Sequence, residues 1–206
     1  LRYNATPTLP LASMFVAAGD KRVAIELTNA LLASSDAIET NVVADRLVLL
    51  HRSLVPSVYC LRKRFRAAEL SENARLALTL IHDDGHANAG DVRRFLGVAG
   101  QKRPDPGDLA LNELMRDFWI DRGPSSVPKK GIPYLPPEGY PYRLFEKTHR
   151  ELVREGDKLK PEDAMQNLLR AFCGAAGPVK PRKLAAIFRL LCKEDELSAA
   201  LAAMEA

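Results

Sequence analysis

The stretch from Gly123 to Pro141 constrains the fold of this chain more than any other feature. It contains six prolines and three glycines. No helix tolerates that density of residues that remove a backbone N–H or favour turns. The flanking segments 118–120 and 140–145 are rich in aromatic and branched residues. This arrangement predicts two short strands that form a hairpin with a long loop at its tip.

Outside this stretch, the spacing of apolar residues predicts a mainly α chain. Ser71 is a typical N-cap residue, Gly85 a typical helix stop, and Pro56 fits a first helical turn. Asn41 suggests the cap of a helix that continues to Leu54. The predicted helices cover 21–32, 41–54, a segment from Pro56 to 68, 71–85, 92–96, 108–118, 146–155 and a region from Pro161 onward.

Three helices followed by a two-stranded hairpin is the order of a winged-helix domain, and residues 71–145 follow that order. A shift of 92 residues places Gly85 on Gly177 and aligns several apolar positions of the two segments. This predicts a second helix-turn-helix unit, although any two amphipathic helix pairs can be aligned in part. We therefore expect a helical segment over 1–70, a winged-helix domain over 71–156, and a partial second unit over 157–206.

The segment from Leu111 to Ile120, with the Gly/Pro-rich wing and Tyr142-Arg143-Leu144 after it, resembles the repeated winged helices of the bacterial DNA glycosylases that unhook interstrand crosslinks. The resemblance covers about residues 71–206. It implies a tandem winged-helix scaffold and binding to duplex DNA. Active members of that family carry a Gln-x-Gln motif, whereas Gln101 and Gln166 are isolated here. The resemblance therefore supplies no catalytic residue.

The charge of the chain permits nucleic-acid binding without requiring it. The formal net charge is +4 and the pI is near 9.0. Clustered Lys and Arg can neutralise backbone phosphates, while a solvated mixed surface is the alternative explanation. The densest cluster lies on the helix after Pro56, where we expect its members to project outward. The candidate nucleic-acid-binding residues are Arg62, Lys63, Arg66, Lys102, Arg103, Lys129, Lys130, Lys180, Arg182 and Lys183.

The third helix of the unit argues against direct reading of bases. Its exposed side is predicted to offer Asn112, Glu113, Arg116 and Asp117. Carboxylates so close to phosphates would be repelled, and a helix that enters the major groove needs hydrogen-bond donors. We therefore expect contact with the phosphate backbone and little sequence specificity.

Catalytic, metal and cofactor signals are weak in this sequence. The segment from His82 to His86 has metal-ligating residue types, but a helix end followed by a tight turn uses the same residues. The three cysteines lack CxxC spacing and suit free thiols in a reducing compartment. No apolar run is long enough to span a membrane. We expect a cytoplasmic protein without metal or cofactor.

These observations predict a non-enzymatic winged-helix protein that contacts duplex DNA through its backbone. Two alternatives remain open. The tandem units could form an adaptor for a protein partner or a homodimer, which would require a large exposed apolar patch. The chain could also be a relative of the glycosylases whose catalytic residues are not recognisable from sequence.

Overall fold

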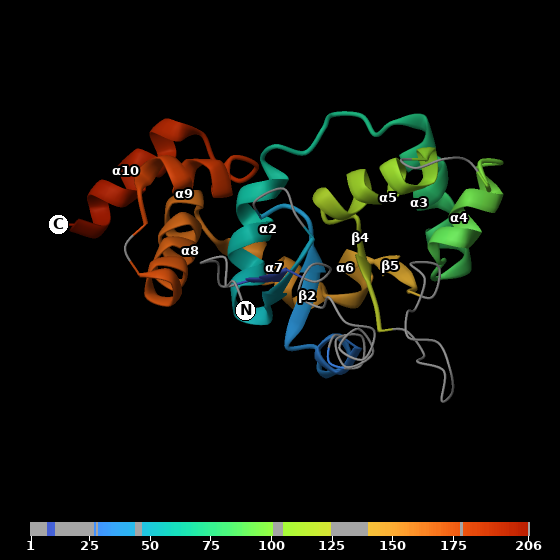
Figure 1. Cartoon of the computed structure of the whole chain (residues 1–206), viewed down its shortest axis with the longest axis horizontal. Coiled ribbons are helices and arrows are strands. Elements are labelled where there is room, and N and C mark those ends of the chain that lie inside the picture. The colour runs from blue at the N-terminus through green and yellow to red at the C-terminus, as the bar shows by residue number, and fades with distance from the viewer. Residues whose placement is uncertain are drawn as a thin grey trace.

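The structure is a computed structural model that describes residues 8–10, 27, 29–43, 47–100, 105–124, 140–177 and 179–205. Its elements form three parts along the longest axis of the molecule (Figure 1). A small sheet with α2 (Val55–Lys63) lies in the middle. One helical unit lies at either end. The chain is mainly helical with small antiparallel sheets, as the sequence predicts.

The prediction of a helix over 41–54 is wrong. The chain instead forms β2 (Ala37–Thr40) and β3 (Val48–His51), which pair in antiparallel fashion with Thr40 opposite Val48. β1 (Thr8–Pro10) pairs with the other edge of β3. The run from Val48 to Leu50 is buried on both faces. A short apolar run of this kind satisfies either a buried strand or a helix, and the pairing of three strands decided the outcome. Further upstream, residues 27 and 29–34 are helical and overlap the later part of the helix predicted over 21–32.

The first winged-helix unit has the predicted order of elements. Its helices are α3 (Glu72–Asp84), α4 (Ala89–Phe95) and α5 (Pro106–Arg116). Ser71 caps α3 through its hydroxyl, Gly85 ends that helix at φ 78°, and a reciprocal Asn88–Asp91 capping box starts α4. These local signals explain why the helix boundaries were predictable.

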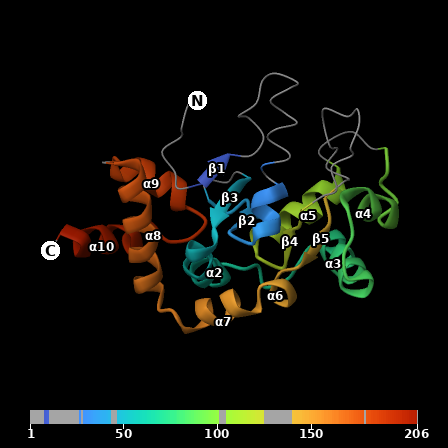
Figure 2. The same ribbon diagram turned by 90° about the horizontal axis from the view of Figure 1, so that it is seen from below.

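The predicted hairpin is confirmed at its base. β4 (Ile120–Arg122) pairs antiparallel with β5 (Tyr142–Leu144), and Ala87 forms a further bridge to Tyr142. The loop 125–139 between the strands lies outside the described residues. β5 leads directly into α6 (Phe145–Thr148) and α7 (Arg150–Lys158). Figure 2 shows α6 and α7 along one edge of the molecule, beside α3.

The second unit consists of α8 (Pro161–Ala176), α9 (Pro181–Phe188) and α10 (Glu194–Glu205). The shift of 92 residues moves α4 to 181–187, which coincides with α9. Both aligned glycines, Gly85 and Gly177, have positive φ. The third helix starts four residues earlier than the shift predicts. The helix-turn-helix order therefore recurs, and the predicted domain boundary at 156 falls near the end of α7.

Two apolar cores hold the molecule together. The first unit has its own core, centred on Ala77, Ile81, Val92 and Leu114. The second unit shares a core with α2, α7 and the sheet. Tyr59 of α2 packs edge-to-face on Phe118, and Phe118 packs likewise on Phe145, with ring centroids 5.9 and 4.9 Å apart. This trio joins α2 to the base of the wing.

Candidate nucleic-acid interface

Arg62 does not lie on the surface, which corrects the prediction that it projects outward for a phosphate. Its side chain is buried and forms an ion pair of 2.6 Å with buried Asp117. It also donates a hydrogen bond to the Leu190 carbonyl. The cause is tertiary: α2 is packed between α7 and α8, so a helix with an amphipathic pattern has no free polar face at this position.

Lys63 and Arg66, the other members of that cluster, are half-buried. Lys63 donates to Asp157 at 2.6 Å, and this hydrogen bond raises the pKa of the lysine. The guanidinium of Arg66 lies over the rings of Tyr59 and Trp119, 5.2 and 4.8 Å from their centroids. In cation–π contacts of this kind, the positive charge of the arginine is attracted to aromatic rings of the protein itself. The residues of this cluster therefore stabilise the packing of α2, whereas the sequence predicted that they face solvent.

The remaining predicted cations divide into two groups. Lys180, Arg182 and Lys183 are exposed at the start of α9, where the first turn contains no acidic residue. Lys102, Arg103, Lys129 and Lys130 lie outside the described residues. In Figure 1, α9 lies at the left end of the molecule and α3 at the right. The structure thus separates the α9 cations from the first winged-helix unit.

The acidic residues of α5 point to internal partners rather than forming an exposed negative face. Asp117 is buried with Arg62, and Glu113 accepts both the backbone N–H and the hydroxyl of Ser71. At the start of the helix, Asp105 pairs with Arg93 at 2.7 Å. Backbone hydrogen bonds and Arg93 hold the pKa of Asp105 below its usual value, although burial acts in the opposite direction. The prediction that Asp117 is exposed is therefore wrong.

A groove of about 640 Å³ opens between α3 and the α6–α7 segment. We call it the α3–α7 groove. Its exposed rim comes from α3 on one side and α6–α7 on the other, and its half-buried or buried inner surface is apolar. The rim residues are Thr79, His82, Glu146, Lys147, Arg150 and Arg154, and the inner residues are Leu78, Trp119, Leu144 and Val153.

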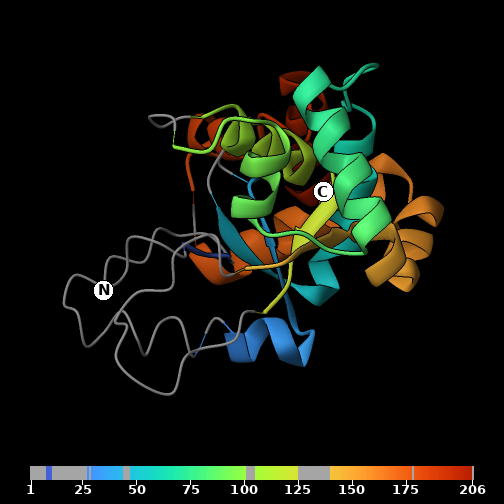
Figure 3. The same ribbon diagram turned by 90° about the vertical axis from the view of Figure 1, so that its right-hand side faces the viewer.

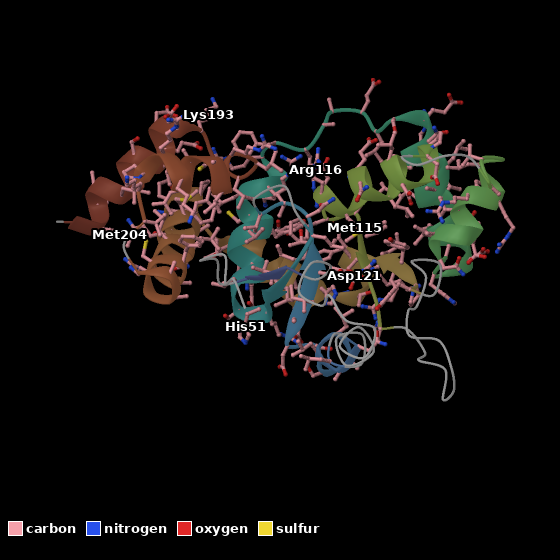
Figure 4. All side chains as sticks on the ribbon, in the orientation of Figure 1. His51, Met115, Arg116, Asp121, Lys193 and Met204 are labelled. Carbon is pink, nitrogen blue, oxygen red and sulfur yellow. The ribbon has the colours of Figure 1, made fainter. Side chains whose placement is uncertain are left out.

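His149 sets the position of the basic side of this groove. It separates α6 from α7, and its Nε2 lies 2.8 Å from the carboxylate of buried Asp121 on β4. Arg143 donates to the same Asp121 oxygen at 2.7 Å. Figure 4 labels Asp121 near the middle of the molecule. Because His149 is held against the hairpin, Lys147 and Arg150 on either side of it are held at the groove.

The cations of the groove make no ion pair with a carboxylate of the described residues. Elsewhere an ion pair with a carboxylate engages Arg52, Arg62, Lys63, Arg64, Arg93, Arg94, Arg122 and Arg143. Lys147, Arg150 and Arg154 make no such pair within the described part of the chain. Glu146 is the one acidic residue among the groove residues. The groove rim therefore has a net positive charge.

Arg150 also links the groove to a second, polar depression of about 360 Å³ that contains Arg52 and Arg143. Both of these arginines are paired with carboxylates, Arg52 with Glu151 and Arg143 with Asp121, so of the two depressions it is the groove that holds cations without such a partner among the described residues. Figure 3, which views the molecule from its α3 end, shows α3 beside the α6–α7 segment.

The sequence contained a signal for these residues. Lys147, Arg150 and Arg154 are spaced by three and four positions within a segment predicted to be helical, and this spacing predicts a common face, although the structure interrupts the helix at His149. They are not adjacent in sequence, so a search for dense clusters favours the run around Arg62 instead. Trp119 could be assigned to the wing flank, but its place in a groove depends on α3 and α7.

A separate polar cluster lies buried behind the hairpin. Glu39 of β2 is fully buried and paired with Arg122 of β4, whose guanidinium lies 4.3 Å from the centroid of the Tyr140 ring. Burial raises the pKa of Glu39, although Arg122 opposes that effect. Tyr142 is buried beside the same pair, and burial raises its pKa. This cluster joins the N-terminal sheet to the wing.

The metal and thiol alternatives gain no support. Within the described ranges, no three His, Cys, Asp or Glu side chains gather closely enough to hold a metal ion. His82 and Asp83 contact each other on the surface, and Gly85 forms the expected helix stop. Burial raises the pKa of Cys192 to about 11, so that thiol is protonated at neutral pH and is a poor nucleophile. None of the described helices combines the length and apolar composition of a membrane span.

No known family model matches this sequence, and no curated protein matches it either. Among solved structures, the fold is similar to that of Streptomyces sahachiroi DNA glycosylase AlkZ, with a TM-score of 0.55 and 13% sequence identity. The match covers 96% of this chain and 57% of that protein, so this chain spans a little over half its length. The chain therefore has an AlkZ-like fold, in agreement with the resemblance drawn from residues 71–206.

Proposed function

We propose that this protein binds duplex DNA through the phosphate backbone, with the rim of the α3–α7 groove as its main contact. The observation that carries the proposal is a set of three cations, Lys147 on α6 with Arg150 and Arg154 on α7, that line one groove and make no ion pair with a carboxylate of the described residues. Cations that are not neutralised by neighbouring carboxylates attract phosphates and release their counterions. A paired arginine such as Arg62 has already lost most of that capacity.

Two further observations support a DNA partner. AlkZ is a DNA glycosylase by name, and the structural similarity to it extends over 96% of this chain. The ion pairs of Asp105 with Arg93 and of Asp117 with Arg62 also neutralise two carboxylates at the ends of α5 that would otherwise repel phosphates. We propose that the α9 cations, Lys180, Arg182 and Lys183, make a second and weaker contact with the duplex.

The test is a titration of short duplexes of unrelated sequence at several salt concentrations. Affinity should fall linearly with salt on logarithmic axes and should depend little on sequence. The triple variant Lys147→Ala, Arg150→Ala, Arg154→Ala should bind about 100-fold more weakly and lower the salt slope by about 3, one unit for each lost phosphate contact.

The charge-matched comparison is the variant Lys180→Ala, Arg182→Ala, Lys183→Ala, which removes the same charge from α9. A larger loss from the α9 variant than from the groove variant would move the main contact to α9. Duplex binding that does not depend on salt would contradict the backbone mechanism altogether.

A second candidate function is cleavage of a base from its sugar. The observation in its favour is the burial of two carboxylates, Glu39 and Asp121, on neighbouring strands of a glycosylase-like fold. A carboxylate near the sugar can activate water or stabilise the positive charge that develops there. Release of alkylated bases from duplex DNA, and its loss in Glu39→Gln, would establish this function.

A protein adaptor is less favoured. The exposed large apolar residues of the described ranges are spread over several helices and include Leu76 on α3, Phe95 on α4 and Met204 on α10. Single exposed apolar residues are normal on soluble proteins.

A further inference from the structure

The α3–α7 groove combines features that a phosphate-binding surface does not need. Contact with a duplex backbone requires cations on an accessible surface, but it does not require an apolar cavity behind them. The inner surface of this groove is formed by Leu78, Trp119, Leu144 and Val153. Its volume of about 640 Å³ lies in the range of small-molecule sites.

Trp119 offers an aromatic ring at the inner surface of the groove. The ring is only half-buried, although it adjoins the core of the first unit. Arg66 covers part of the ring, with its guanidinium 4.8 Å from the centroid, but Arg66 is not among the groove residues. Trp119 thus contacts Arg66 and also lines the groove.

The groove brings cations and an aromatic ring to one site, which suits a ligand with an anionic and a planar group. Lys147, Arg150 and Arg154 occupy the exposed rim, and Trp119 with Leu144 lies deeper. An unpaired nucleotide has a flat base for the inner surface and a phosphate for the rim. Base–aromatic stacking accepts any base, because every base has a π face.

We propose that the α3–α7 groove accepts an unpaired nucleotide, so that the protein prefers duplex DNA that contains a bulged or single-stranded position. This inference rests on the proposed function and names its substrate class. The base stacks on Trp119, and the flanking phosphates lie against Lys147, Arg150 and Arg154. The charge of the rim favours this occupant over a neutral or basic peptide.

The first experiment uses Trp119 itself, since it is the single tryptophan of the chain. Its fluorescence should be quenched when single-stranded oligothymidylate is added to the full chain, and salt should reverse the quenching. An intact duplex should quench much less. No quenching by the oligonucleotide would overturn the inference, as would quenching by an acidic apolar peptide in its place.

The second experiment compares an intact duplex with the same duplex carrying one unpaired thymidine. We expect roughly tenfold tighter binding to the bulged duplex, from the gain of one stacked base. Trp119→Leu keeps an apolar side chain against the core and should abolish this preference, while Trp119→Phe should retain part of it. Phe95→Ala is the matched control, because Phe95 is 52% exposed on α4 and does not line the groove.

The outcomes separate the two proposals. Equal affinity of the wild-type chain for both duplexes would refute the unpaired-nucleotide site and leave duplex binding intact. A preference that persists in Trp119→Leu would also refute it. Absence of binding to either duplex would instead refute the proposed function.

Discussion

Arg62 and Arg150 lie on helices that pack against each other. They have the same charge, but their surroundings differ. Arg62 on α2 is 8% exposed and bound to the buried carboxylate of Asp117. Arg150 on α7 is exposed at the groove and has no carboxylate partner among the described residues. The partner of a cation, rather than its density in the sequence, decides whether its charge supports the fold or remains available to a ligand.

The largest difference between the two arginines should appear when each is replaced in turn. Arg62→Ala should lower the free energy of unfolding by about 3–5 kcal/mol, because Asp117 would remain buried without a counterion. Arg150→Ala should change it by less than about 0.5 kcal/mol. Urea denaturation measures both. If Arg62→Ala weakened DNA binding while stability was unchanged, the surface role first predicted for Arg62 would be correct.

The contact between the two helices offers the next test. Gly156 of α7 approaches α2 so closely that an added Cβ would lie 2.9 Å from the Pro56 carbonyl oxygen and 2.8 Å from Tyr59 Cδ1. Gly156→Ala should therefore push the helices apart and cost about 1–3 kcal/mol of stability in thermal or urea unfolding. Gly174→Ala is a suitable control, since nothing lies within 4 Å of its added Cβ.

A new carboxylate at the groove would test whether its cations must lack a partner in order to bind DNA. Thr79 is exposed on α3 and lines the groove opposite α7. Thr79→Glu should give the groove cations an internal partner and weaken duplex binding about tenfold, close to the loss of one phosphate contact. Thr79→Gln has the same size without the charge and should bind like the wild-type chain. Equal binding by the glutamate variant would show that phosphates do not enter this groove.

The smallest expected effect concerns acid stability. Burial opposes ionisation of Asp105, but the Asp108 N–H and Arg93 outweigh it and lower its pKa. A lowered pKa stabilises the folded state above the pKa of the unfolded chain, and this contribution is lost as pH falls through the folded value. Stability should therefore decline below about pH 4. Asp105→Asn keeps an N-cap acceptor and should show a shallower decline in acid.

Local sequence signals predicted the first unit well. Ser71, Gly85 and the proline-rich stretch each restrict the backbone within a few residues of themselves, so the helix boundaries and the hairpin could be inferred from the chain alone. Periodicity failed at 41–54, where four consecutive apolar residues suit a strand as well as a helix. Pairing with β1 and β2 decided that segment, and the pairing partners lie outside any local window.

Four features could be read from the amino-acid sequence alone: a mainly helical chain, a hairpin at a known place, a repeated helix-turn-helix order and a modest excess of positive charge. Tertiary structure alone decided which charges remain available. Burial of a charge is costly unless a partner accompanies it, and the partners of Arg62 and Arg122 come from 55 and 83 residues away. The groove at Trp119 likewise exists only because α3, β5 and α7 converge there.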